Sequence, residues 1–133
     1  HISARPAEPM PTPLTQEVAR KSGAAKSFTA RRGPKASMPD PTHVEDKSIT
    51  TAGVQKLYLG RDDADMICGK RILLMDDVIS TGGSIHAMEE LVKLAGGIVA
   101  GRVSVLAEGD AAARKDIKFL APLPVFNADG SVK

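Results

Sequence analysis

The chain has 133 residues, 42% of them hydrophobic, which is enough for one domain with a modest core. Its 18 Lys and Arg residues nearly balance 16 Asp and Glu, which argues against the strongly basic surface that non-specific nucleic-acid binding needs. The single cysteine, Cys68, excludes an internal disulfide and a multi-cysteine zinc site. No apolar run is long enough to span a bilayer and no secretory leader is visible, so we expect a soluble cytoplasmic protein.

The N-terminal segment, residues 1–13, has no apolar periodicity and contains Pro6, Pro9, Pro11 and Pro13. Because proline removes backbone donors and restricts the residue before it, we expect this segment to be irregular. Apolar side chains at helical spacing then predict a helix over Leu14–Ser22, which Gly23 ends. A short strand is predicted at Lys26–Arg31.

The middle of the chain combines a long loop with a hairpin. Arg32–Asp46 contains three prolines, one glycine and few large apolar residues, as in a functional lid or a disordered segment. Two strand candidates, Ser48–Thr51 and Val54–Leu59, flank an Ala-Gly pair and predict a hairpin. We expect Asp62–Ile67 to form a short helical turn, with acids at its start where the helix dipole favours them.

The second half of the chain alternates strands with a helix. A continuous apolar strand is predicted at Arg71–Met75, and two more at Ile98–Leu106 and Ile117–Leu120, the last closed by Pro122 and Pro124. Between the first two lies an amphipathic helix, ended by Gly96 and Gly97, whose apolar face is Ile85, Met88, Leu91, Val92 and Ala95. Strand, helix and strand form a right-handed βαβ unit, so the fold class is α/β, with a mainly parallel twisted sheet flanked by helices.

The stretch RILLMDDVISTGGS, from Arg71 to Ser84, holds the strongest functional pattern. Its strand leads into two adjacent acids, Asp76 and Asp77, and then into a loop of Ser80, Thr81, Gly82, Gly83 and Ser84. In an open α/β sheet, ligands bind at the carboxyl ends of the strands. Glycines allow close approach, and backbone amides at the start of a helix form a nest for phosphate. The same loop is also compatible with a plain tight turn and an ordinary N-cap.

The paired acids favour a ligand over a plain turn, because adjacent carboxylates are tolerated only when they are solvated or bound to a cation or a hydroxyl-rich group. A ligand with phosphate at one end and a diol or magnesium at the other satisfies both features, as a sugar phosphate does. Neither the lysine-bearing phosphate loop of nucleoside triphosphatases nor the GxGxxG dinucleotide pattern occurs. His1, His43 and His86 have no partner at metal-ligand spacing, which predicts surface roles for them.

The segment ILLMDDVISTGGS resembles the sequence with which type I phosphoribosyltransferases bind phosphoribosyl pyrophosphate (PRPP). Other stretches resemble the adenine phosphoribosyltransferase branch of that family: PLTQEVARKSG, TARRGPKASMPDP, SITTAGVQKLYL and AGGIVAGRVSVLAEGDAAARKDIKFLAPLPVF. The resemblance implies a type I phosphoribosyltransferase-like domain over residues 14–126, N-terminally incomplete and with a flexible lid loop or hairpin, followed by a tail at 127–133. It also implies a homodimer that acts in purine salvage in the cytoplasm, with neither nucleic acid nor membrane as a partner.

The resemblance further implies transfer of ribose 5-phosphate from PRPP to a purine base, adenine favoured, with Mg²⁺ and release of pyrophosphate. The 5-phosphate would lie on the loop Ser80–Ser84. Asp76 and Asp77 would face the ribose hydroxyls and hold the metal indirectly, through PRPP or water. Arg31 would meet pyrophosphate, and Lys35 and, more weakly, Arg32 would contribute from the lid. The catalytic candidates are therefore Asp76, Asp77 and Arg31, and for the basic residues a solvated loop is the alternative.

Two departures from the family bear on activity. Where family members carry an N-terminal strand and a cover for the base, this chain reads HISARPAEPMPT, so we expect a core strand to be missing. Thr51-Ala52 stands where many adenine enzymes have a Glu-Tyr pair, which leaves the identity of the base open. Glu108 and Asp110 follow a strand near the place where the family holds its base, and a plain loop is their alternative. A PRPP-sensing regulator without catalysis and an inactive truncated remnant are the other functions that the sequence allows.

Overall fold

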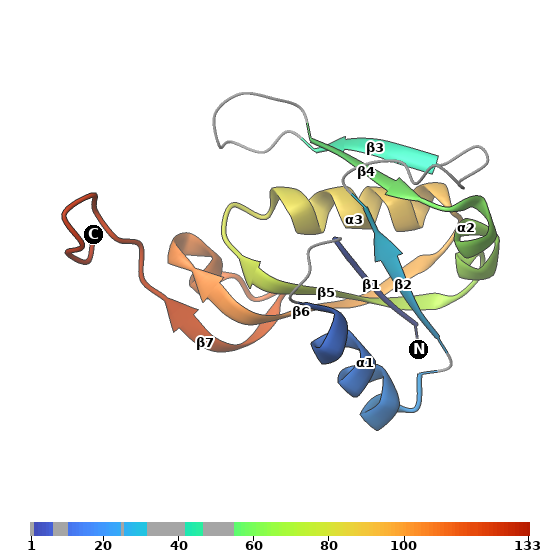
Figure 1. Ribbon diagram of the computed structural model, residues 1–133, viewed down its shortest axis with the longest axis horizontal. Helices are drawn as coiled ribbons and strands as arrows, with labels where there is room; N and C mark the ends of the chain where they lie inside the picture. The colour runs from blue at the N-terminus through green and yellow to red at the C-terminus, as the bar shows by residue number, and fades with distance from the viewer. Residues whose placement is uncertain (1, 7–10, 25, 32–41, 47–54) are drawn as a thin grey trace.

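The computed structural model describes residues 2–6, 11–24, 26–31, 42–46 and 55–133 (Figure 1). In chain order the elements are β1 (Ile2–Pro6), α1 (Pro11–Ser22), β2 (Lys26–Ala30), β3 (Thr42–Asp46), β4 (Gln55–Leu59), α2 (Arg61–Ile67), β5 (Arg71–Ile79), α3 (Gly83–Leu94), β6 (Ile98–Glu108), the 3-10 helix η1 (Gly109–Ala113) and β7 (Lys118–Leu123). Among the described residues, no helix has both the length and the apolar composition to cross a membrane.

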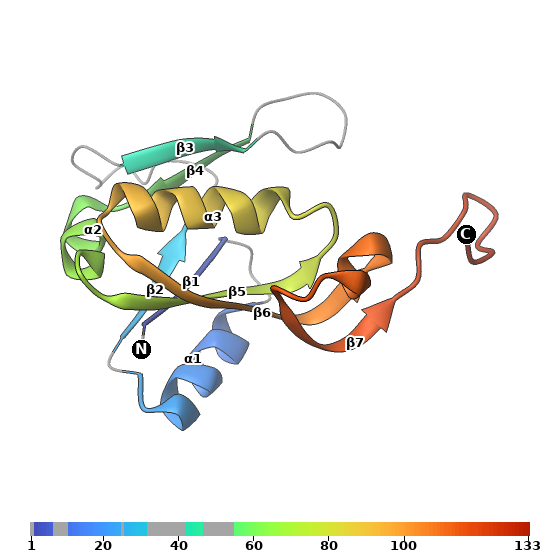
Figure 2. The same ribbon diagram turned by 180° about the vertical axis from the view of Figure 1, so that it is seen from behind.

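A five-stranded sheet with the order β2-β1-β5-β6-β7 forms the centre of the molecule, and all its described strand pairs are parallel. Helix α3 covers one face of this sheet and α1 the other, while the antiparallel β3-β4 hairpin lies on the far side of α3 (Figures 1 and 2). The predicted fold class, a mainly parallel α/β sheet flanked by helices, is confirmed.

The core lies between the sheet and α3. Ile72 and Leu74 of β5 and Met88 of α3 are completely buried, as the apolar run and the helical spacing predict. Strand β5 extends to Ile79, four residues beyond the predicted end. The extension arises because Val78 and Ile79 continue the parallel ladder opposite Leu106 and Ala107 of β6. The two aspartates therefore belong to the strand itself.

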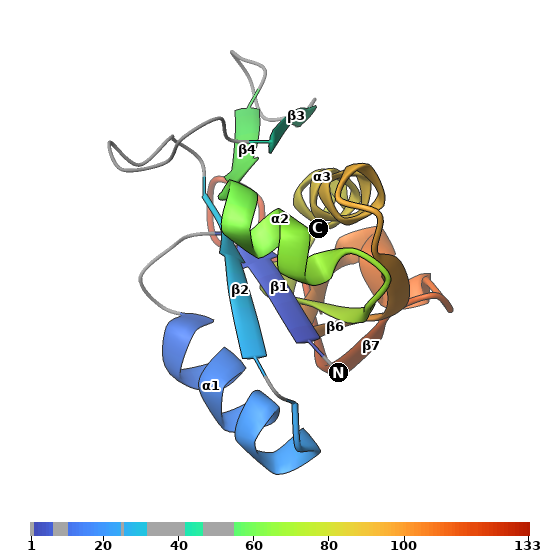
Figure 3. The same cartoon turned by 90° about the vertical axis from the view of Figure 1, so that its right-hand side faces the viewer.

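Strand β1 corrects the expectation that residues 1–13 are irregular and that a core strand is missing. Its backbone, Ile2–Pro6, pairs in parallel with β2 along its whole length and with β5 over Ile2–Ala4. Figure 3 shows β1 beside β2, with α1 packed next to them. Prolines are compatible with this arrangement because Pro6 is the last residue of the strand and Pro11 the first of the helix, where no backbone donor is needed.

The hairpin is present, but with a different first strand. Strand β4 agrees with the predicted Val54–Leu59 from Gln55 onward, and Val54 lies outside the described residues. Its partner is β3 (Thr42–Asp46), inside the segment predicted as a loop. The predicted strand Ser48–Thr51 lies outside the described residues, as does most of the predicted lid. Strand β7 also differs, since it continues through Pro122. An edge strand tolerates proline because one side of its backbone has no partner.

Candidate functional site

The glycine loop lies at the carboxyl end of β5 and leads directly into α3. Gly82 is the N-cap of that helix and has a φ of +85°, a left-handed conformation that side-chain-bearing residues rarely adopt. The backbone N–H of Gly83 donates a hydrogen bond of 3.4 Å to Thr81 Oγ1 within the loop. A hollow of about 160 Å³ opens here, lined by Asp76, Val78, Ile79, Ser80, Thr81, Gly82, Gly83, Ser84 and Ile85. The structure thus brings Asp76 and all five predicted loop residues to one concave surface.

The two aspartates do not point the same way. Because side chains alternate along a strand, Asp76 and Asp77 lie on opposite faces of β5. Asp76 is 6% exposed and lines the hollow, and its Oδ1 accepts a 2.9 Å hydrogen bond from the backbone N–H of Asp77. Asp77 Oδ1 accepts a 2.8 Å bond from the backbone N–H of Val78 and is only partly buried. Of the predicted acidic pair, Asp76 is therefore the one that faces the glycine loop.

Ser104 is a buried polar residue next to Asp76 that the sequence analysis missed. The two residues are direct partners in the parallel β5-β6 ladder, so their side chains share one face of the sheet. Ser104 Oγ is fully buried and has no hydrogen-bond partner in the part of the chain that the structure describes. A register shift after Ile72 creates this pairing. No local pattern in β6 reveals such a shift.

A hydrogen bond ties the loop to the neighbouring strand. Ser80 Oγ donates to Glu108 Oε1 at 3.0 Å, and Glu108 is the last residue of β6. From the sequence, Glu108 is compatible with either a role near the base or a plain loop. In the structure Glu108 directly contacts a residue of the predicted phosphate loop.

Arg114 is a second residue beside the loop that the sequence analysis did not single out. A Cβ atom placed on Gly82 would lie 2.5 Å from Arg114 Nη1. Arg114 also donates two parallel hydrogen bonds to Asp116, Nε to Oδ1 at 2.9 Å and Nη2 to Oδ2 at 2.6 Å. These bonds lower the pKa of Asp116 to about 2, and Arg102 acts in the same direction more weakly. The run AAARKD resembles a solvated loop in sequence, so no local signal links it to Gly82.

The predicted basic residues are only partly within the described chain. Arg31 is exposed and follows β2, and its backbone N–H and C=O form hydrogen bonds of 2.8 and 2.6 Å with Tyr58. Because β2, β1 and β5 are parallel, Arg31 lies at the same edge of the sheet as Ser80. Arg32 and Lys35 lie outside the described residues.

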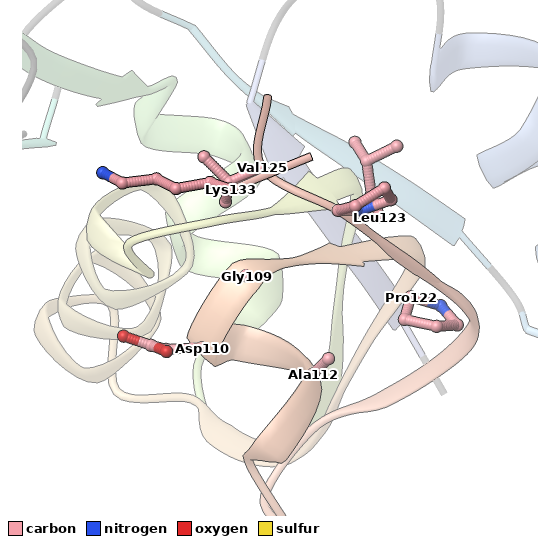
Figure 4. Close-up of a pocket in the computed structure, with 8 residues that line it drawn as sticks. Gly109, Asp110, Ala112, Pro122, Leu123, Val125 and Lys133 are labelled. Carbon is pink, nitrogen blue, oxygen red and sulfur yellow. The ribbon is translucent and has the colours of Figure 1, made fainter. Parts of the chain in front are cut away.

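A larger hollow of about 570 Å³ lies beside η1, the end of β7 and the C-terminal tail, lined by Gly109, Asp110, Ala112, Pro122, Leu123, Pro124, Val125 and Lys133 (Figure 4). In this view Asp110 and Lys133 lie on one side, and Pro122 and Leu123 on the other. Since β6 and β7 are parallel to β5, both hollows open at the carboxyl edge of the sheet. Ser80 of the smaller hollow is hydrogen-bonded to Glu108, the residue directly before Gly109 of the larger hollow.

Fold and site together define an α/β domain with a glycine-rich loop at the carboxyl edge of a parallel sheet. No protein-family model matches the chain. It is 36% identical to the adenine phosphoribosyltransferase of Corynebacterium jeikeium over 102 residues, 77% of this chain and 46% of that protein. It is 32% identical to the Corynebacterium diphtheriae enzyme of the same name over 116 residues, 86% of this chain and 59% of the other. The chain spans about half the length of the curated relatives it matches.

The comparison of structures agrees with the comparison of sequences. The crystal structure of the adenine phosphoribosyltransferase from Thermoanaerobacter pseudethanolicus superposes with a TM-score of 0.75 at 22% identity, covering 92% of this chain and 70% of that one. The chain is therefore adenine phosphoribosyltransferase-like in sequence and has the fold of the type I phosphoribosyltransferases.

Proposed function

We propose that this chain carries the PRPP-binding centre of a purine phosphoribosyltransferase. The enzyme would transfer ribose 5-phosphate from PRPP to a purine base, with adenine favoured, and release pyrophosphate. One observation carries the proposal: Asp76 and every residue from Ser80 to Ser84 line the same hollow of about 160 Å³. The similarity to adenine phosphoribosyltransferases supports the choice of reaction.

The loop is suited to the 5-phosphate of PRPP. Gly82 and Gly83 bring backbone close to a ligand without side chains in the way, and α3 begins at Gly83 with its positive dipole end toward the hollow. Thr81 and Ser84 add hydroxyl groups. Each hydrogen bond to a charged phosphate contributes roughly 1.5–3 kcal/mol.

Asp76 supplies negative charge where the sugar would lie. As the bond from ribose to pyrophosphate breaks, positive charge develops on the sugar ring and negative charge on the leaving group. The Asp76 carboxylate, buried at 6% exposure, acts on that charge through a medium of low dielectric constant. Asp77 would contribute from the opposite face of β5 at longer range, and Arg31, at the same sheet edge, would receive the pyrophosphate with Lys35.

Magnesium fits this centre as a companion of PRPP rather than as an ion held by the protein alone. Within the described residues, no group of three or more His, Cys, Asp or Glu side chains is arranged to hold a metal. Mg²⁺ prefers oxygen ligands and is commonly bound by one or two carboxylates together with substrate phosphates. Asp76 and Asp77 would therefore hold it indirectly, through PRPP or water, and the ion would neutralise charge on the leaving pyrophosphate.

The larger hollow is the proposed place for the purine. Its walls include Pro122, Leu123 and Val125, which can pack against a flat ring, and Asp110, which can accept a hydrogen bond from an amino group. Support for this place comes from Glu108, which accepts a hydrogen bond from Ser80 of the loop and directly precedes Gly109 of the larger hollow. By the same family resemblance, we propose that the full protein acts in the cytoplasm as a homodimer.

The test is a titration of the chain with PRPP and Mg²⁺ by calorimetry, followed by incubation with adenine, hypoxanthine, guanine or xanthine. We expect binding, and AMP with pyrophosphate from adenine. Binding without product from any base would instead indicate a PRPP sensor, and no binding would contradict the proposal and favour an inactive remnant.

Variants locate the activity at the proposed site. Asp76→Asn should lower kcat/KM by about 100-fold, because it removes a buried charge that faces the sugar. The matched control is Asp65→Asn, an exposed carboxylate of α2. Asp77→Asn should weaken the reaction more than His86→Ala, which changes an exposed residue of α3. Equal effects within either pair would contradict the assignment.

A further inference from the structure

The guanidinium group of Arg114 occupies the space beside Gly82 of the phosphate loop. A Cβ atom at position 82 would lie 2.5 Å from Arg114 Nη1, closer than real Cβ atoms approach a neighbour, and 3.8 Å from Cζ, an ordinary contact distance. Arg114 follows η1, so this contact joins the loop to a segment on the other side of β6 in the chain. Gly82 therefore has a left-handed backbone, and a side chain at this position would also have to displace the end of the Arg114 side chain.

Asp116 fixes the orientation of this guanidinium. Its carboxylate accepts two parallel hydrogen bonds, from Arg114 Nε at 2.9 Å and from Arg114 Nη2 at 2.6 Å. This leaves Nη1 on the Gly82 side. Such a fork holds the planar group in one orientation. The Arg114 side chain is only 34% exposed, so neighbouring residues cover most of it and limit its motion. The oriented guanidinium group therefore lies against Gly82, and glycine is the residue type with the greatest backbone freedom.

We propose that Arg114 is a positioning residue that holds the loop Thr81–Ser84 in its phosphate-binding conformation. This inference rests on the proposed function for its ligand, PRPP, but the contact itself belongs to the free protein. A loop with two adjacent glycines loses much conformational entropy when it closes on a phosphate. A group that restricts Gly82 beforehand removes part of that loss and so strengthens binding.

Amide hydrogen exchange without ligand tests the inference in the free protein. Arg114→Met should make the amides of residues 81–84 exchange at least about fivefold faster, because loss of the contact lets the loop open more often. The control is Arg20→Met, which removes an Arg–carboxylate fork of the same geometry, with Glu17 at 3.0 and 2.6 Å, on α1. Unchanged exchange in the loop, or the same change in both variants, would overturn the inference.

Calorimetry with PRPP and Mg²⁺ adds the functional readout. Arg114→Met should raise the Kd about tenfold, because the loop must then lose more conformational entropy on binding, and Arg20→Met should leave the Kd unchanged. Asp116→Asn distinguishes a positioning role of Arg114 from a purely electrostatic one. The substitution weakens the two hydrogen bonds that orient Arg114 and should therefore weaken PRPP binding. If Arg114 acted only by its charge, removal of the neighbouring carboxylate would tighten binding instead and overturn the inference.

The two proposals fail in different ways. If the unaltered chain does not bind PRPP, the proposed function fails, and the exchange measurement still decides the role of Arg114. Should Arg114→Met not fold, Arg114→Lys replaces it, since lysine keeps the charge but cannot form the planar fork. Faster loop exchange in the lysine variant supports positioning, and exchange as slow as in the unaltered chain overturns it.

Discussion

Ser80 Oγ donates a 3.0 Å hydrogen bond to Glu108 Oε1, across 28 positions of the sequence. The donor directly follows β5 and the acceptor is the last residue of β6, so the bond connects the glycine loop to the strand that precedes Gly109 of the larger hollow.

Loss of this hydrogen bond should weaken PRPP binding without unfolding the protein. Ser80→Ala removes the donor from an exposed position, and we expect the Kd for PRPP to rise about fivefold, equivalent to about 1 kcal/mol. Glu108→Gln keeps an acceptor oxygen and should have a smaller effect than Glu108→Ala. Calorimetric titration measures both.

The control for Ser80→Ala is Ser22→Ala, which removes a hydroxyl bonded to the Ala19 carbonyl at the exposed end of α1. It should leave PRPP affinity unchanged. An equal loss in both serine variants would contradict a specific role for the Ser80–Glu108 bond.

Gly82→Ala should abolish most PRPP binding. The substitution places a side chain on a residue with a φ of +85°, which costs about 1–2 kcal/mol, and drives its Cβ into Arg114 Nη1. Gly23→Ala is the matched control, because Gly23 also has a positive φ of +68° but nothing within 4 Å of the new Cβ. Urea denaturation should show a loss of about 1 kcal/mol or more for each, while calorimetry should show lost binding only for Gly82→Ala. Retained binding by Gly82→Ala would mean that the loop geometry is not needed.

The fork between Arg114 and Asp116 should persist down to low pH. The pKa of Asp116 is lowered from 3.8 to about 2 by the hydrogen bonds from Arg114, so folding favours the ionised carboxylate. The stabilisation is therefore fully present above about pH 4 and is lost as the pH falls toward 2. A ¹³C NMR titration of the Asp116 carboxyl should show a midpoint near 2, and Arg114→Met should return it toward 3.8. A midpoint near 3.8 in the unaltered chain would show that the fork does not form in solution.

Strand β1 should be essential to stability. The backbone of Ala4 is paired with Phe28 on one side and Leu74 on the other, so Ala4→Pro removes a ladder hydrogen bond whichever way its N–H points. We expect a loss of about 2 kcal/mol or more in the free energy of unfolding, measured with urea.

Leu120→Pro is the control for Ala4→Pro. Strand β7 is at the edge of the sheet. Leu120 lies two residues before Pro122 in this strand, so the backbone nitrogens of both residues point to the same side. Because the Pro122 nitrogen carries no hydrogen, a second proline on that side should cost little. Its effect should be under about 1 kcal/mol. If Ala4→Pro were equally mild, β1 would not be a central strand in solution.

Local sequence patterns were sufficient for the elements around the phosphate loop. The apolar run that begins at Arg71 and the helical spacing from Ile85 onward are repeats within a few residues, and both β5 and α3 follow them. The position of Ser80–Ser84 at the carboxyl end of a parallel strand follows from the same βαβ pattern. The hairpin was predicted only in part. Strand β4 pairs with β3, which is more distant in sequence than the predicted partner, and a local pattern does not show which of two candidate segments will pair.

By itself, the sequence determined that a strand, a glycine loop and a helix come together, with Asp76 and Asp77 near the end of the strand that leads into the loop. Only the tertiary structure decided that β1 enters the sheet between β2 and β5, that Ser104 lies opposite Asp76, and that Arg114 lies against Gly82. The physical reason is the range of the interactions. Helical periodicity and turn geometry arise between residues a few positions apart, whereas strand order, register and side-chain contacts between distant segments depend on how the whole chain packs.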